Sequence, residues 1–273
     1  MHTLPIYQID AFGRGVFTGN PAAIVQLETW LPDETLLSIA QENNLSETAF
    51  ILGDGAHWEL RWFTPTTEVA LCGHATLAGA HAVAQHISPG INAMTFQTRY
   101  SGQLQVRYED GLYHMEFPAI QTHPRAITPE LIAALDAEPR LASLGHYAPN
   151  EADILAVFDT EDEIKSLDPN FNAFHALGSR GVIATARADH ISGRECDFVS
   201  RYFCPACGIN EDPVTGSAHS LLTPYWAEQF KKPILKAEQL SARHGWLSVQ
   251  LSGERIIISG QAHSYMSGKI KTY

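Results

Sequence analysis

Residues 61–75 read RWFTPTTEVALCGHA and residues 201–218 read RYFCPACGINEDPVTGSA, so the chain carries nearly the same stretch twice. In each copy an Arg-aromatic-Phe-x-Pro run precedes an acidic residue, and a glycine follows that residue five positions later: Glu68 and Gly73, then Glu211 and Gly216. The second copy is longer by three residues, which lie before its acidic residue. The shared order and spacing predict two related domains within one chain.

The length and composition agree with two domains of ordinary size. The chain has 273 residues, of which 45% are hydrophobic and 18% are charged, as is typical of a soluble globular protein. Its 30 acidic residues against 18 basic ones give a net charge of −12. An acidic chain without a basic run is not expected to bind nucleic acid or an anionic membrane, although a local positive pocket can still hold a small anion.

The N-terminal stretch MHTLPIYQIDAF has no cationic segment followed by an apolar one, and the sequence has no run of about 18 apolar residues. We therefore expect a cytoplasmic protein without a membrane span. The four cysteines are too few for a disulfide framework in a chain of this size, so we expect reduced thiols.

Periodicity predicts an α+β fold in residues 1–118, which are expected to form the N-terminal domain, joined by residues 264–273. Residues 119–263 repeat the same pattern of helices and strands and are expected to form the second domain. The expected helices are residues 33–44, capped by Asp33, and residues 74–86, 129–137, 161–167 and 217–230. The expected strands are residues 5–12, 20–27, 45–52, 57–65, 93–100, 102–110, 112–118, 153–158, 181–187, 197–203, 245–253 and 255–263. Because most of these strands alternate apolar and polar residues, a doubly wound parallel sheet is not favoured.

Each repeated stretch places Gly-His-Ala or Gly-Ser-Ala at the first turn of a small-residue helix. The first turn of a helix presents unpaired N–H groups and the positive end of the helix dipole, which attract an anion, and glycine allows a ligand to approach closely. We expect the two helix ends to face one interdomain cleft and to bind a carboxylate there. The alternative is that Gly73 and Gly216 only permit close helix packing.

Cys72 raises the question of thiol chemistry, because a cysteine before each glycine would suit a racemase that uses one thiolate base and one thiol acid. The equivalent position before Gly216 is Thr215, which cannot act as a base near neutral pH. We therefore interpret Cys72 as a small buried residue, with a Cys72-dependent racemase or epimerase as the alternative.

Five stretches in a fixed order resemble the PhzF-like phenazine-biosynthesis isomerase family, which is related to diaminopimelate epimerase. They are DAFGRGVFTGNPAAIV, NLSETAFI, CGHATLAGAHAV, SRYF and GINEDPVTGSAHSLL, and the resemblance continues to LSGERIIISGQA near the C-terminus. It implies two pseudo-symmetric domains of diaminopimelate-epimerase-like fold, each a mixed sheet or barrel around a central helix. It also implies a homodimer that needs no metal and no organic cofactor.

The same resemblance assigns roles to individual residues. Glu47 in the Ser-Glu-Thr-Ala-Phe segment matches the general acid/base, and His74 and Asp212 match its catalytic partners. The positions that match substrate-binding groups are Asn20, Gly73, Gly216 and Ser217. His244 departs from the pattern, since relatives often carry glycine there.

The residues around Glu47 support its role independently of the resemblance. Its neighbours Leu45, Ala49 and Phe50 are apolar, and such surroundings disfavour the ionised form of a carboxyl and suit a group that moves protons near neutral pH. The alternative is an ordinary exposed glutamate on a strand.

Cys204 and Cys207 form a C-x-x-C pair of the kind seen in thioredoxin-like proteins or in zinc sites. No second C-x-x-C and no H-x3-H pair accompany it, so we interpret both cysteines as incidental members of the loop before Asp212.

The sequence as a whole predicts a cofactor-independent isomerase that moves a proton within a small carboxylate-bearing substrate. Glu47 is expected to carry the proton. Besides the Cys72-dependent enzyme, the alternative is a non-catalytic protein that keeps the fold and binds a metabolite or a protein partner.

Overall fold

The computed structural model describes residues 2–149 and 151–272. By its internal contacts the chain divides into unit 1, which comprises Met1–Glu116 and Ser259–Tyr273, and unit 2, which comprises Phe117–Ile258. Within the described residues, every helix is too short or too polar to cross a membrane.

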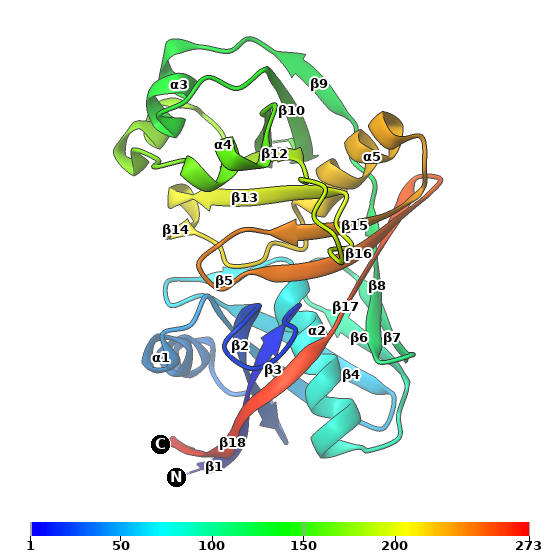
Figure 1. The fold of residues 1–273 in the computed structure, drawn as a ribbon. Helices are drawn as coiled ribbons and strands as arrows, with labels where there is room; N and C mark the ends of the chain where they lie inside the picture. Colours follow the sequence, from blue (N-terminus) through cyan, green and yellow to red (C-terminus); the bar gives the residue numbers. More distant parts are fainter. Residues whose placement is uncertain (1, 150, 273) are drawn as a thin grey trace. The chain divides into compact units, whose positions relative to one another are not determined.

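Unit 1 is built on a mixed sheet. In spatial order its strands are β18 (Ala262–Thr272), β1 (His2–Ala11), β2 (Asn20–Leu27), β3 (Glu47–Asp54), β4 (His57–Phe63), β6 (Ala93–Thr98), β7 (Gln103–Glu109) and β8 (Leu112–Pro118). The short β5 (Glu68–Val69) also pairs with β4. The pairs β2–β3 and β4–β6 are parallel and the others are antiparallel. The last strand, β18, runs beside the first, β1 (Figure 1).

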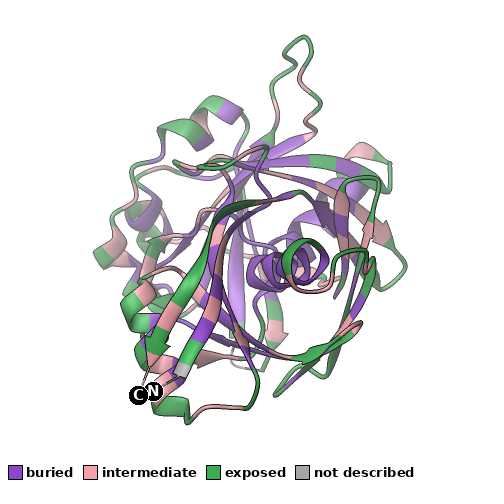
Figure 2. Cartoon of the chain, turned by 90° about the horizontal axis from the view of Figure 1, so that it is seen from below, coloured by how far each residue is buried: buried purple, intermediate pink, exposed green. Residues whose placement is uncertain are grey.

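The central helix of unit 1 is α2 (Gly73–Ala82), which continues into a π-helical turn, Val83–Ile87. All ten residues of α2 are buried, and in Figure 2 a buried helix is seen nearly end-on among strands. Its small residues include Ala75, Ala78 and Gly79, which let the sheet wrap closely around it. The expectation of a buried small-residue helix is confirmed.

A second helix, α1 (Asp33–Asn43), covers the outer face of the same sheet. Its buried residues Leu36, Ile39 and Ala40 join an apolar cluster with Val25 and Phe50 from the strands. The sheet of unit 1 is therefore covered on both faces over its central strands.

Unit 2 repeats this architecture. Its strands in spatial order are β9 (Thr122–Arg125), β10 (Leu141–Ala148), β11 (Glu151–Val157), β12 (Gly181–Arg187), β13 (Phe198–Cys204), β15 (Ile234–Gln239) and β16 (Gly245–Ser252), and β14 (Ile209–Glu211) pairs with β13. The pairs β11–β12 and β13–β15 are parallel, as are β2–β3 and β4–β6. From β16 the chain continues into β17 (Arg255–Gly260).

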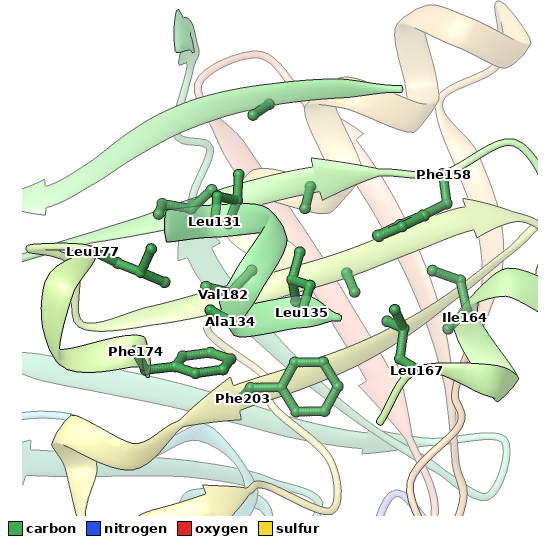
Figure 3. Packing of buried hydrophobic residues seen from close by; sticks show 14 of the residues in the cluster. Leu131, Ala134, Leu135, Phe158, Ile164, Leu167, Phe174, Leu177, Val182 and Phe203 are labelled. Atoms are coloured by element: carbon green, nitrogen blue, oxygen red, sulfur yellow. The ribbon is translucent and has the colours of Figure 1, made fainter. Parts of the chain in front are cut away.

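The central helix of unit 2 is α5 (His219–Phe230). On the outer side of the sheet lie α3 (Pro129–Leu135), α4 (Glu161–Ser166) and a 3₁₀ helix (Phe171–Ala176), whose apolar side chains meet those of the strands. Figure 3 shows this packing, with Leu131, Leu135, Phe174 and Phe203 converging on one layer. Two units with the same order of parallel and antiparallel pairs confirm the α+β fold.

The expected alternation of the strands is wrong for the middle of each sheet. Six of the eight positions of β2 are buried, and so are the last six positions of β11 and the first six of β12. A central helix covers one face of these strands and outer helices cover the other, so both faces select apolar residues. Alternation does hold for β8, which lies near the end of its sheet.

Two local expectations also fail. Pro32, not Asp33, occupies the N-cap position of α1, and the Asp33 carboxylate instead accepts hydrogen bonds from Arg61 at 2.8 Å and Arg99 at 3.1 Å. No strand was predicted between residues 118 and 129, but this stretch contains β9. The strands β5, β10, β14, β15 and β18 were not predicted.

Candidate functional site

In unit 1 the structure brings together Glu47, the first residue of β3, and His74, the second residue of α2. Glu47 Oε2 lies 3.2 Å from His74 Nε2. The imidazole is 4% exposed, whereas the Glu47 side chain retains 17% of its accessible surface. The sheet and its central helix therefore place a partly accessible carboxyl against a buried imidazole.

The partner of the other ring nitrogen decides how His74 can act. The Asn20 amide nitrogen lies 3.1 Å from His74 Nδ1. Burial lowers the pKa of His74 to about 3, so the ring is neutral at physiological pH. If Nδ1 accepts the hydrogen bond from Asn20, the ring proton is on Nε2, which faces Glu47 Oε2 at 3.2 Å. This chain orients one oxygen of the carboxyl group.

Cys72 belongs to the same cluster. Its thiol is free and buried, and Sγ lies 3.5 Å from His74 Nδ1. Reactive cysteines depend on a nearby positive charge that stabilises the thiolate. The neutral imidazole of His74 does not supply that charge, so this contact does not mark Cys72 as a base.

Glu47, Cys72 and His74 also meet a distance criterion for metal ligands, since their candidate atoms lie within 4.8 Å of one another. However, His74 presents Nδ1 to Cys72 and Nε2 to Glu47. An ion at Nδ1 would therefore face Cys72, and one at Nε2 would face Glu47. We interpret the cluster as a carboxyl group placed against a neutral imidazole.

In unit 2 the predicted site residues lie on the loop between β14 and α5. The Asp212 carboxylate is buried and accepts a hydrogen bond from the Thr215 hydroxyl. Gln239, which is fully buried on β15, donates to the Asp212 carbonyl at 2.7 Å and accepts from the Thr215 amide at 2.8 Å. Ser241 donates to the Pro213 carbonyl at 2.8 Å. The loop is thus held from the neighbouring strand and the turn after it.

Three consecutive amides follow this loop. Among the described residues, no acceptor binds the N–H groups of Gly216, Ser217 or Ala218, whereas the next amide, that of His219, donates to the Gly216 carbonyl at 3.1 Å. In unit 1 the corresponding amides, Gly73 to Ala75, form the first turn of α2, which leaves such groups without intrahelical acceptors. Each repeated stretch therefore ends in a row of N–H donors.

The structure shows how His244 is accommodated at a position where the resemblance led us to expect glycine. This residue has a φ of 54°, in the left-handed region that glycine adopts most easily. Its Nδ1 lies 2.9 Å from Glu238 Oε1, and its ring stacks on Trp246. These contacts offset the backbone cost of a non-glycine residue at this position.

The interpretation of Cys204 and Cys207 as reduced thiols is wrong, because the structure joins them in a disulfide. They flank a 3₁₀ turn, Pro205–Cys207, and their Cα atoms lie 5.3 Å apart, within the usual range for a disulfide. Cys72 and Cys196 are free. The C-x-x-C spacing was a usable signal, but we set it aside because four cysteines are too few for a disulfide framework.

The predicted residues thus fall into two groups, each described within its own unit. Asn20, Glu47, Gly73 and His74 lie together in unit 1, and Asp212, Gly216 and Ser217 lie together in unit 2. Sequence reasoning missed Gln239 and the hydroxyl of Thr215. A single buried glutamine on a strand produces no periodic pattern, so no local signal marks it.

Comparison with known proteins places the chain in one family. Residues 9–268 match the family model described as phenazine biosynthesis-like protein. A Pseudomonas aeruginosa protein named as an uncharacterized isomerase is 47% identical, with 98% of each chain covered. The solved structure of a PhzF-family phenazine biosynthesis protein from Enterococcus faecalis superposes with a TM-score of 0.91, at 41% identity over 99% of this chain and all of that one.

A more distant structure shows how far the fold extends. A probable proline racemase from Agrobacterium radiobacter has a TM-score of 0.64 at 10% identity, covering 99% of this chain and 93% of that one, and at this identity the likeness concerns the fold alone. The family model and the Pseudomonas relative, by contrast, each extend over nearly the whole sequence. The chain therefore belongs to the phenazine biosynthesis-like, or PhzC–PhzF, family.

Proposed function

We propose that the protein is a cofactor-independent isomerase that moves a proton within a small carboxylate-bearing substrate, with Glu47 as general acid and base. The observation that carries the proposal is the chain Asn20–His74–Glu47, which orients a partly accessible carboxyl group. The isomerase names of relatives support the reaction class. Neither observation identifies a substrate.

In the proposed reaction His74 holds Glu47 Oε2 through its Nε2–H, and Oε1 removes a proton from a substrate carbon. The electron pair of the broken C–H bond moves into the adjacent conjugated system, and Glu47, whose carboxyl proton exchanges with solvent, returns a proton to another carbon. Electrons and protons balance without an oxidant or a second base. Because His74 stays neutral, it orients the carboxyl group without competing for the proton.

The proposal assigns binding of the substrate carboxylate to the N–H groups at the start of the two repeated helices. Those of Gly73 and His74 belong to unit 1, and those of Gly216 and Ser217 belong to unit 2. Such donors, together with the positive end of a helix dipole, favour an anion. Asp212 and the Ser217 hydroxyl are proposed to orient polar substituents of the substrate.

The rival enzyme is a racemase or epimerase that uses Cys72. Local geometry supports Thr215 as the counterpart of Cys72. In unit 1 the Thr76 hydroxyl donates to the Cys72 carbonyl. In unit 2 the ring of His219, at the same distance after its glycine, binds the Thr215 carbonyl. A two-thiol mechanism therefore has no second thiol at the matching position. A non-catalytic binding protein is the other alternative, and it would not depend on Glu47.

The test begins with a panel of small cyclic amino and hydroxy acids, using thermal stabilisation to find ligands and deuterated water to detect turnover. Wild-type protein is expected to introduce deuterium at one carbon of a bound compound. Glu47→Gln should keep binding and the fold but lose at least about a hundredfold in rate, the usual scale for general acid/base catalysis. Cys72→Ala should lose far less.

Glu59→Gln is the matched control, because Glu59 is an exposed glutamate on β4 of the same unit whose carboxylate accepts a hydrogen bond from the Trp30 indole. An inactive Cys72→Ala with an active Glu47→Gln would establish the racemase instead. Ligand binding without deuterium exchange across the panel would favour the non-catalytic protein.

A further inference from the structure

Tyr147 lies at an irregular point of β10 that has no counterpart in unit 1. The register between β10 and β11 shifts between His146 and Ala148, so the bulge leaves Tyr147 outside the strand pairing. The equivalent pair of unit 1, β1 and β2, keeps its register through Ala11 and Asn20. A bulge redirects a side chain out of the regular pleat, and such bulges are frequent beside functional sites.

A buried ion pair fixes the Tyr147 ring. The Arg180 guanidinium lies 4.3 Å from the centre of that ring. Arg180 in turn makes two hydrogen bonds, of 3.1 and 2.7 Å, to the fully buried carboxylate of Asp153, which also accepts from the Tyr202 hydroxyl at 3.2 Å. Arg180 keeps 29% of its side-chain surface, but two parallel hydrogen bonds to a fully buried carboxylate leave its guanidinium little freedom to reorient. Tyr147 therefore rests on a rigid base.

The Tyr147 hydroxyl donates to the Ser217 carbonyl at 3.2 Å. That carbonyl also accepts the Ser220 amide at 3.0 Å, so its direction is set from two sides. In a trans peptide the N–H points opposite to the C=O, and the next amide, that of Ala218, has no acceptor among the described residues. Donation to a carbonyl also polarises the peptide and strengthens its N–H as a donor.

We propose that Tyr147 is a positioning residue, whose hydroxyl orients the Ser217–Ala218 peptide so that the Ala218 N–H binds the substrate carboxylate. This inference rests on the proposed function, since it names a further donor for the same carboxylate and the group that aims it. Asp153 and Arg180 act one step further away by holding the tyrosine ring.

The Asp153 carboxylate is the competing acceptor for the same hydroxyl proton. Burial, followed by the nearby Asp153 charge, raises the pKa of Tyr147 well above its usual value, so the hydroxyl keeps its proton and can donate only once. If that proton goes to Asp153, removing the hydroxyl leaves the Ser217–Ala218 peptide unchanged. The two arrangements therefore differ in what Tyr147→Phe does to this peptide.

The chain contains only two Ser-Ala pairs, Ser217–Ala218 and Ser241–Ala242, which permits a direct spectroscopic test. Labelling serine carbonyl carbons with ¹³C and alanine nitrogens with ¹⁵N gives one HNCO peak for each pair. Tyr147→Phe should move the Ser217–Ala218 peak and leave the other in place as an internal reference. Tyr225→Phe, the matched control on α5, removes a hydroxyl that contacts Arg140 and should move neither peak. An unmoved Ser217–Ala218 peak overturns the proposal.

Benzoate and its neutral isostere benzamide test the consequence for binding. Tyr147→Phe should weaken benzoate binding by about 3- to 10-fold, the scale of one lost hydrogen bond, and leave benzamide binding unchanged. Equal loss for both compounds, or a change in melting temperature alone, means a merely structural role and overturns the proposal. Wild-type protein that does not prefer benzoate contradicts the carboxylate site of the proposed function, and the HNCO result still decides whether Tyr147 orients the peptide.

Discussion

The two copies of the repeated stretch share a framework and differ in their chemistry. In unit 1 Arg61 binds Glu68 through two hydrogen bonds, of 2.7 and 2.8 Å, and in unit 2 Arg201 binds Glu211 in the same manner at 2.8 and 2.9 Å. In both, the glutamate pairs across the strands with the phenylalanine of its own motif. The Arg and Glu of the motif thus brace a turn, which explains their spacing without any catalytic role.

The positions that differ lie on the strand before each motif. Thr48 pairs with Phe63 and Val182 pairs with Phe203, so Glu47 corresponds to Gly181. A Cβ atom at Gly181 would lie 2.6 Å from the Tyr202 hydroxyl, which leaves no room for a carboxylic side chain. In the proposed assignment, unit 1 therefore carries the proton-transfer group, while in unit 2 the Tyr202 hydroxyl, which binds Asp153 of the Asp153–Arg180 ion pair, occupies the equivalent space.

The largest expected effect concerns that ion pair. Arg180→Met should destabilise the protein by about 3–5 kcal/mol, because it leaves the fully buried Asp153 carboxylate without its cation. Urea unfolding measures the loss. Arg140→Met is the control: its pair with Asp159 is half exposed on both sides, and its removal should cost less than about 1 kcal/mol. Similar losses for the two variants would contradict the buried role of Asp153.

The shared framework predicts a smaller effect that is similar in the two units. Arg61→Lys and Arg201→Lys should each cost about 1.5–3 kcal/mol, because lysine cannot make both hydrogen bonds to one carboxylate. Both arginines also reach the outer helix of their own unit: Arg61 binds Asp33, and Arg201 binds the carbonyls of Ile164 and Leu167. Urea unfolding of each variant measures the loss of stability. If only one of the two substitutions destabilised the protein, the two motifs would not be equivalent.

Much of the fold was predictable because its evidence is repeated along the chain. The order Arg, Glu, Gly predicted two equivalent units, and the small residues from Ala75 to Ala82 predicted a buried helix. Three of the strands that were missed are too short to give such a signal: β9 has only four residues, and β14 and β5 are shorter still. Their pairing depends on distant strands and not on local pattern.

The candidate site was predictable in part, because its residues lie in stretches that resemble one family. Glu47 and His74 stand in recognisable segments, and the structure places their side chains within hydrogen-bonding distance. The groups that hold the second loop come from other parts of the chain, as Gln239 does for Asp212 and Tyr147 does for Ser217. Only the three-dimensional structure reveals contacts between residues 27 and 70 positions apart.

Thr76 in unit 1 and His219 in unit 2 each bind the carbonyl of the residue that precedes Gly73 or Gly216. Of the two, only His219 can make the stability of the protein depend on pH. Burial lowers the pKa of His219 to about 4, below the usual value near 6.5. Because the unfolded chain takes up the proton more readily, this histidine's contribution is complete above about pH 6.5 and is lost as the pH falls toward 4. The slope is about 1.4 kcal/mol per pH unit.

His219→Thr introduces the residue of unit 1 and removes this titration. Whatever its effect at pH 7.5, the further loss of stability between pH 7.5 and 5.5 should shrink by about 1.3 kcal/mol relative to wild type. Urea unfolding at the two pH values measures this difference. Thr76→Ser, which introduces no titratable group, should leave it unchanged. An unaltered pH dependence in His219→Thr would mean that the buried imidazole does not resist protonation.

The last comparison concerns the turns after the two arginine strands. In unit 1 the Thr64 hydroxyl accepts the amides of Thr66 at 3.2 Å and Thr67 at 3.0 Å. In unit 2, whose stretch is three residues longer, Pro205–Cys207 form a 3₁₀ turn that the Cys204–Cys207 disulfide closes. If both devices only close a turn, Thr64→Ala should cost about 0.5–1.5 kcal/mol, as one or two lost hydrogen bonds do.

The Cys204→Ala, Cys207→Ala double variant should cost about 1–2 kcal/mol, because a short loop gains little from cross-linking. Urea midpoints with and without a thiol reductant measure both losses, and the reductant should affect only proteins that carry the disulfide. A loss well above 3 kcal/mol in the double variant would show that the disulfide stabilises more than its turn, and the equivalence of the two turns would then fail.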